Sequence, residues 1–131
     1  MKDKPLVSII MGVYNCEETV RDSIESIISQ SCQNWEFIIC DDGSTDATYD
    51  ICREYARKDR RFTVLRNRQN RKLAASLNRC LARAQGKYIA RMDADDISLP
   101  LRLEKETGFL ETHPHIAAVG CCCYITNKKN I

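Results

Sequence analysis

The stretch Leu6-Val7-Ser8-Ile9-Ile10-Met11 decides the fold, because it is apolar throughout except at Ser8. A continuous apolar run of this length is typical of a strand in a parallel sheet, where other elements cover both faces. The apolar residues that follow recur at helical spacing, which predicts an amphipathic helix that begins near a capping-box pair, Asn15 and Glu18. A buried strand that leads into such a helix is the first unit of an α/β fold.

The same alternation continues along the chain. Further strands are predicted at residues 35–40, 62–65, 88–92 and 117–124, and further helices at residues 46–58 and 73–84. Gly86 follows the helix at 73–84, and Ser98 and Pro100 are typical of the start of a fourth helix that runs to about Thr112. Because strands joined by helices need right-handed crossovers, we expect a three-layer α/β/α fold with a mostly parallel sheet. Residues 1–131 fit a single domain without a linker or internal repeat.

The formal net charge is only +2, but the basic residues are concentrated in one part of the chain. Between Arg53 and Lys87 there are twelve Lys or Arg residues and only two acids, Glu54 and Asp59. Such a segment binds nucleic acid, a membrane surface or phosphates, or it forms two solvated helix faces. Few aromatic residues lie among these charges, which argues against stacking on bases, and we expect no nucleic-acid partner.

The chain has eight cysteines, but it contains no C-x-x-C pair and no histidine at zinc-finger spacing. Neither a zinc site nor a thioredoxin-like motif is therefore indicated. Residues 1–5 lack the apolar core of a signal peptide, and no apolar run approaches the length of a membrane span. Reduced thiols and the lack of an export signal favour a cytoplasmic protein.

Three carboxylates lie within four residues at Asp93-Ala94-Asp95-Asp96, directly after the strand predicted at 88–92. These groups repel one another at pH 7, and a bound cation would neutralise them. Oxygen ligands favour Mg²⁺, Mn²⁺ or Ca²⁺, and Mg²⁺ is commonly shared between one or two carboxylates and substrate phosphates. The cluster therefore points to a phosphorylated ligand. The alternative is a solvated acidic turn that caps the next helix.

Polar clusters follow three of the predicted strands, at the edge of the sheet where parallel folds bind ligands. They are Gly12-Val13-Tyr14-Asn15, Asp41-Asp42-Gly43-Ser44 and residues 93–96. Tyr14 could stack on a base or pack half-buried. Asp42 could accept the imide N–H of a pyrimidine, or shape a turn with Asp41 and Gly43.

The remaining candidates concern phosphate and metal. Asp95 could bind a divalent ion, with Asp93 holding a ribose hydroxyl or a metal-bound water. The metal would then stabilise charge on a diphosphate leaving group. Arg71 and Lys72, at the start of the helix predicted at 73–84, could approach phosphate or remain in solvent.

Taken together, these motifs resemble those of the family 2 glycosyltransferases. The matching stretches are Val7 to Asn15, Asp41 to Asp46, Leu73 to Asn78, and Asp93 to Asp96 with Pro100 and Arg102-Leu103-Glu104. The similarity covers nearly the whole chain, in order and at the right separations. It implies a Rossmann-like GT-A fold and transfer of a sugar, with inversion, from a nucleotide-diphosphate sugar bound with Mg²⁺ or Mn²⁺.

The resemblance also implies the roles of single residues. Tyr14 and Asp42 match positions that hold the base, and Asp93 and Asp95 match the two acids of the D-x-D motif, with Asp95 the more direct metal ligand. The residues expected to bind the nucleotide are Gly12, Val13, Tyr14, Asp42, Lys72 and Asp93. The expected donor is a UDP-sugar, and the acceptor is a saccharide, a lipid or a protein. Such enzymes serve cell-envelope or polysaccharide biosynthesis.

Two departures from the family pattern concern the contacts to base and phosphate: Gly12 stands where many relatives have proline, and Lys72 where many have glycine. The family's general base is an acid on a later segment, which we expect beyond Ile131, so no catalytic base is assigned here. The chain is thus interpreted as a truncated fold, the donor-binding half without the acceptor-binding part. The alternative is an inert module that holds nucleotide and metal. The full-length form is also expected to associate peripherally with the inner face of the membrane.

Overall fold

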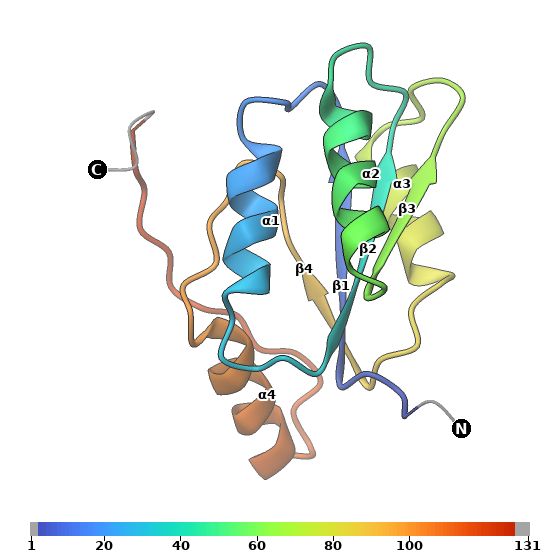
Figure 1. Ribbon diagram of the computed structural model, residues 1–131. Helices are drawn as coiled ribbons and strands as arrows, with labels where there is room; N and C mark the ends of the chain where they lie inside the picture. The colour runs from blue at the N-terminus through green and yellow to red at the C-terminus, as the bar shows by residue number, and fades with distance from the viewer. Residues whose placement is uncertain (1–2, 128–131) are drawn as a thin grey trace.

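The computed structural model describes residues 3–127, in which four strands alternate with four helices (Figure 1). Their bounds are β1 Val7–Val13, α1 Val20–Ile28, β2 Trp35–Asp41, α2 Thr48–Lys58, β3 Phe62–Arg66, α3 Leu73–Leu81, β4 Tyr88–Arg91 and α4 Arg102–Thr112. The strands form one parallel sheet in the order β3-β2-β1-β4. The predicted α/β class and the parallel sheet are confirmed. The first two and last four residues of the predicted domain lie outside the described residues.

The alternation of side chains along β1 builds a three-layer molecule. Ile9 and Met11 are fully buried in a core cluster that also contains residues of α1 and α2. Ile10, between them, belongs to a second cluster with β2 and with Cys80 of α3. Figure 1 accordingly shows α1 and α2 on one face of the sheet and α3 on the other. The prediction that both faces of the first strand are covered is confirmed, and each such side chain contributes about 1.5–3 kcal/mol of burial energy.

A buried glutamine connects α1 to the start of α4. The side-chain amide of Gln30 donates to the carbonyl of Leu99 at 2.8 Å, and its oxygen accepts from the N–H of Leu103 at 3.0 Å. Within α1 itself, the hydroxyl of Ser23 donates to the carbonyl of Asp96 at 2.6 Å. These bonds fix the segment between β4 and α4, which carries the acidic cluster.

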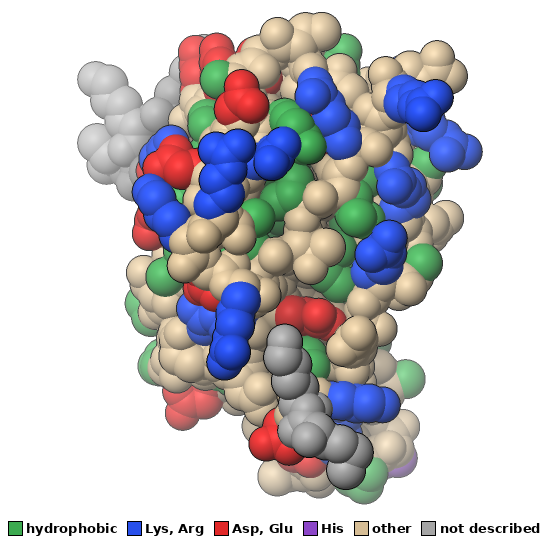
Figure 2. Space-filling view, turned by 45° about the vertical axis from the view of Figure 1, so that its right-hand side comes forward, with side chains coloured by type: hydrophobic (Ala, Val, Ile, Leu, Met, Phe, Trp, Pro, Cys, Tyr) green, Lys and Arg blue, Asp and Glu red, His purple; other side chains and the backbone are tan. Residues whose placement is uncertain are grey.

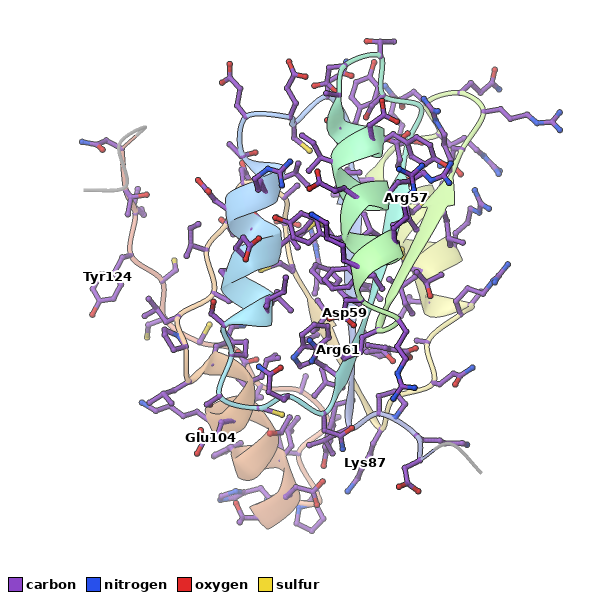
Figure 3. All side chains as sticks on the ribbon, viewed as in Figure 1. Arg57, Asp59, Arg61, Lys87, Glu104 and Tyr124 are labelled. Atoms are coloured by element: carbon purple, nitrogen blue, oxygen red, sulfur yellow. The ribbon has the colours of Figure 1, made fainter. Side chains whose placement is uncertain are left out.

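The fifth strand predicted at Ala117–Tyr124 is wrong. Residues 117–127 have no regular secondary structure, and the side chain of Tyr124, 84% exposed, points away from the molecule (Figure 3). A strand persists when a neighbouring backbone pairs with its N–H and C=O groups. Within the described residues the sheet ends at β4, and no strand pairs with this segment.

The predicted capping box at α1 is also wrong. The helix begins at Val20 after Thr19, and no side chain caps it. Asn15 instead bridges two loops: its side-chain oxygen accepts from the N–H of Thr45 at 2.9 Å, and its own N–H donates to the hydroxyl of Ser44 at 3.0 Å. The side chain is therefore used to join the loops after β1 and β2.

Helix α3 ends earlier than predicted and helix α4 begins later than predicted. Helix α4 begins at Arg102, and the hydroxyl of Ser98 accepts from the guanidinium of Arg102 at 3.0 Å instead of capping the backbone. Helix α3 ends at Leu81, well before Gly86. A Cβ at Gly86 would lie 2.5 Å from the backbone nitrogen of Ser8, so this glycine allows the chain to pass close to β1.

Candidate functional site

The register of the sheet brings the loops after β1, β2 and β3 together. Val13 and Asp41 are paired residues at the carboxyl ends of β1 and β2. The N–H of Asp42 donates to the carbonyl of Val13, and the N–H of Asn67 donates to the carbonyl of Asp41, each at 2.8 Å. Tyr14, Asp42 and Asn67 therefore leave the sheet side by side, at the edge where parallel sheets bind ligands.

The first hollow at this edge, called the Asp42 hollow, has a volume of about 320 Å³. It is lined by Gly12, Val13, Tyr14, Asp42, Asn70, Lys72, Leu73 and Ser76. Five of the six residues predicted to bind the nucleotide thus lie around one hollow. A Cβ at Gly12 would lie 2.7 Å from Cδ1 of Leu73, so the absence of a side chain at Gly12 keeps this part of the hollow open.

Asp42 is buried and held by several donors. Its Oδ1 accepts from the side-chain amide of Asn67 and from the N–H of Arg71, each at 2.7 Å. The amide of Asn67 also donates to the hydroxyl of Ser76 at 3.0 Å, and its oxygen accepts from the guanidinium of Arg79 at 2.5 Å. Burial by itself raises the pKa of Asp42, but the hydrogen bonds from Arg71 and Asn67 outweigh it, so that the pKa lies below its ordinary value. Asp42 is therefore an ionised, oriented acceptor.

The turn after β2 is shaped by Asp41 and not by Asp42. The fully buried carboxylate of Asp41 accepts from the N–H of Ser44 at 3.2 Å and lies 3.2 Å from Nε of Arg66. Gly43 has a φ of 81°, which favours glycine. Because Asp41 and Gly43 build the turn, the carboxylate of Asp42 remains on the wall of the hollow.

The second hollow, called the acidic hollow, has a volume of about 570 Å³ and adjoins the first. Gly12, Tyr14 and Leu73 line both hollows. The acidic hollow is also lined by Asp93 and Asp95. The two predicted D-x-D acids thus lie at the same edge of the sheet as Tyr14, and Tyr14 lines both hollows.

The two acids differ in their surroundings. Asp93 forms an ion pair with Arg91 at 3.2 Å, whereas the carboxylate of Asp95 has no hydrogen bond or ion pair within residues 3–127. Burial raises the pKa of the neighbouring Asp96, and the negative charges of Asp95 and Asp93 raise it further. Negative charge is therefore concentrated at the end of β4, and Asp95 has oxygen atoms free for a cation.

A divalent ion fits this arrangement only together with a ligand. Among residues 3–127, no group of three His, Cys, Asp or Glu side chains is placed to hold a metal ion. Mg²⁺ is usually bound by one or two carboxylates, with its remaining positions taken by water and substrate phosphates. Asp95 and Asp93, which both line the acidic hollow, would be the protein ligands of such an ion.

Lys72 lies at the entrance to α3 in an unusual backbone conformation. Its φ of 72° and ψ of 163° fall in a region that glycine adopts readily and other residues rarely do. The residue also lines the Asp42 hollow. The glycine expected at this position from the resemblance would fit the observed backbone without strain.

Sequence reasoning missed Asn67 and Leu73. Asn67 follows β3 directly, so the rule that selected the ends of the other strands would have found it. Leu73 gives no comparable signal, because an apolar residue at the start of a helix usually packs into a core. In the structure it is 45% exposed and lines both hollows.

Two further observations concern the cysteines and the length of the helices. All eight cysteines are free thiols, of which Cys121, Cys122 and Cys123 are exposed. Among the described helices, none combines the length and apolar character that crossing a membrane requires.

Comparisons with known proteins agree with these features. The family model for glycosyl transferase family 2 matches residues 8–130. The putative glycosyltransferase EpsE of Bacillus subtilis (strain 168) is 55% identical over 121 residues, which is 92% of this chain and 44% of EpsE. The crystal structure of S. aureus TarS 1-349 in complex with UDP-GlcNAc has a TM-score of 0.77 at 26% identity, and the match covers 82% of this chain and 32% of that one.

A second solved structure shares the fold. The mannosyltransferase PcManGT from Pyrobaculum calidifontis, in complex with GDP-Man and Mn²⁺, has a TM-score of 0.66 at 26% identity. That match covers 73% of this chain and 29% of PcManGT. The chain therefore spans less than half the length of each of these proteins.

Proposed function

The chain belongs to glycosyl transferase family 2, and we propose that it binds the nucleotide-diphosphate sugar from which the whole protein transfers a sugar to an acceptor. The observation that carries the proposal is the junction of two hollows at Tyr14, one containing the oriented acceptor Asp42 and the other the acids Asp93 and Asp95. A nucleoside diphosphate needs such neighbouring sites, one for its base and one for its charged phosphates.

In this proposal the base lies in the Asp42 hollow. Uracil presents an imide N–H, which an ionised, oriented carboxylate accepts, and Tyr14 supplies a ring on which the base stacks. Guanine also presents a ring N–H, that of its lactam group, whereas the corresponding ring nitrogen of cytosine is an acceptor. Asp42 therefore favours UDP over CDP, and the complex of TarS with UDP-GlcNAc supports uridine as the base.

The diphosphate lies toward the acidic hollow. Asp95 would hold Mg²⁺ or Mn²⁺ together with the phosphates, Asp93 would lie beside the ribose or a metal-bound water, and Lys72 would face the diphosphate. A bound divalent ion would act as a Lewis acid that stabilises charge on the leaving diphosphate. The Mn²⁺ in the PcManGT complex supports this assignment. Transfer with inversion needs a general base near the acceptor hydroxyl, which we assign to another part of the whole protein.

Calorimetric titrations with UDP, GDP, CDP and dTDP, each with and without Mn²⁺, test the proposal. We expect UDP with Mn²⁺ to bind more tightly than UDP alone, and CDP to bind weakly in both conditions. At 100 times the dissociation constant, binding would stabilise the fold by about 2.7 kcal/mol, which thermal unfolding detects. No heat and no rise in melting temperature with millimolar UDP and Mn²⁺ would refute donor binding by this chain.

Two variants separate the two hollows. Asp95→Asn is expected to remove the effect of Mn²⁺ while leaving weak metal-free binding of UDP. Asp42→Asn is expected to weaken metal-free UDP binding by about 1–3 kcal/mol, because the amide oxygen would stay bonded to Asn67 and the N–H of Arg71 and the NH2 group would face the imide N–H. Equal losses of metal-free binding in both variants would contradict these separate roles.

A further inference from the structure

A third hollow is basic and lies behind the wall of the Asp42 hollow, because two of its lining residues, Asn67 and Arg71, donate hydrogen bonds to Asp42. This basic hollow has a volume of about 670 Å³ and is lined by Arg66, Asn67, Arg68, Gln69, Arg71 and Arg79. Four of its six lining residues are arginines and none is acidic, and it shares no lining residue with the Asp42 hollow or the acidic hollow. Figure 2 shows Lys and Arg side chains gathered at the upper right of the molecule, without Asp or Glu beside them.

Two of the arginines are held in position by the protein. The guanidinium of Arg66 lies 3.2 Å from the carboxylate of Asp41, donates to the carbonyl of Ser44 at 3.1 Å and packs 4.1 Å from the centre of the Tyr49 ring. The guanidinium of Arg79 donates to two neutral oxygens, the carbonyl of Arg66 and the side chain of Asn67. A preorganised wall of this kind loses little side-chain entropy when a ligand binds.

The other two arginines are not paired. The side chains of Arg68 and Arg71 are exposed and form no hydrogen bond or ion pair within residues 3–127. Of the four arginines around the hollow, only Arg66 has a carboxylate partner, so the charges of Arg68, Arg71 and Arg79 are not neutralised. These like charges repel one another, and an anion between them would relieve the repulsion.

We propose that the basic hollow binds a phosphate-bearing anion at a site separate from the nucleotide site. Guanidinium groups match phosphate oxygens with paired N–H donors, and several of them around one hollow favour a multiply charged group over a single carboxylate. The same chemistry is offered by a soluble diphosphate and by the headgroups of anionic lipids. The alternative is a face of arginines that binds only water and salt.

Titration of the chain with inorganic pyrophosphate, followed by amide signals in NMR spectra, tests the proposal. EDTA is present so that no divalent ion draws pyrophosphate to the acids at the end of β4. We expect saturable shifts at residues 66–71 and 79, and weaker binding as salt is raised. Shifts centred on residues 93–95, or no saturation at millimolar pyrophosphate, would overturn the proposal.

Matched variants distinguish a site from general positive charge. Arg68→Gln combined with Arg71→Gln removes two charges from the hollow and is expected to weaken pyrophosphate binding at least about tenfold. Arg60→Gln combined with Arg83→Gln also removes two exposed charges, but these residues precede β3 and β4 in the chain, whereas the basic hollow follows the carboxyl end of β3. This control variant is expected to leave binding unchanged. Equal weakening in both double variants would overturn the proposal, provided that thermal unfolding shows both to be folded.

Sedimentation with vesicles identifies the source of the phosphate. If anionic phosphatidylglycerol vesicles bind the chain, phosphatidylcholine vesicles do not, and the Arg68→Gln, Arg71→Gln variant loses this binding, the site takes lipid headgroups. If pyrophosphate binds at the hollow but neither vesicle does, the site takes a soluble phosphate. Both results support an anion site.

Discussion

Replacing Lys72 with glycine is expected to stabilise the fold, although it removes a long side chain. The backbone of Lys72, with φ 72° and ψ 163°, lies in a region that costs a residue with a Cβ about 1–3 kcal/mol. Glycine avoids this cost, but it gives the unfolded chain more freedom, which costs about 0.4–1 kcal/mol. The net gain is about 1 kcal/mol, or roughly 3–5 °C in melting temperature for a chain of this length.

Urea and thermal unfolding of the wild type, Lys72→Gly and Lys72→Ala measure this effect. Lys72→Ala removes the same side chain but keeps the Cβ, so its strain remains and no comparable gain is expected. If Lys72→Gly is no more stable than Lys72→Ala, the reasoning from backbone strain is wrong.

The same pair of variants also tests the proposed contact between Lys72 and the diphosphate, because both variants lose the ammonium group. Both should bind UDP with Mn²⁺ more weakly than the wild type, and unchanged affinity would contradict a contact between Lys72 and the diphosphate.

Three further predictions follow from single residues. The pKa of Asp42 is lower in the folded protein than its ordinary value, so the ionised carboxylate stabilises the fold above the ordinary carboxyl pKa, and this stabilisation is lost as the pH falls through the folded pKa. The difference in unfolding free energy between wild type and Asp42→Asn, measured by urea unfolding, should therefore shrink from about pH 7 to about pH 3. A difference that stays constant with pH would contradict this. Gly12→Ala places a methyl group 2.7 Å from Cδ1 of Leu73 and should weaken UDP binding, whereas Gly108→Ala, whose Cβ meets nothing within 4 Å, should not; equal affinities would show that Gly12 does not keep the hollow open. Burial, with the nearby Cys16 and Asp41, raises the pKa of Cys52 to about 12, so a thiol reagent at pH 8 should modify this residue only after unfolding, and rapid modification in the native state would count against its burial.

The elements of the fold were predictable where local pattern and tertiary packing agree. The apolar run in β1 and the helical spacing in α1 indicate a strand covered on both faces and a helix packed on one, as the core clusters require. The prediction of a strand at residues 117–124 went wrong because strand formation depends on a partner. Its apolar residues resemble those of a strand, but no described strand lies beside them to complete a ladder.

The site was predictable to the extent that strand ends define it. Tyr14, Asp42 and the acids at 93 and 95 follow strands, and the parallel register brings them to one edge. The contacts between side chains were not predictable, because they join residues far apart in sequence. Asn15 is used between loops instead of capping a helix, and the hydrogen bonds that orient Asp42 come from Asn67 and the loop before α3.

The most direct test of the proposed donor site is to locate Mn²⁺ by its broadening of amide signals in NMR spectra recorded with UDP. If the ion and nucleotide share the two adjoining hollows, broadening should be strongest at residues 93–96, extend to residues 12–14, require UDP for full strength and disappear in Asp95→Asn. Broadening centred on Glu17 and Asp46 or on the exposed Cys121–Cys123, or the same pattern in Asp95→Asn, would contradict a donor site built on Asp42 and Asp95.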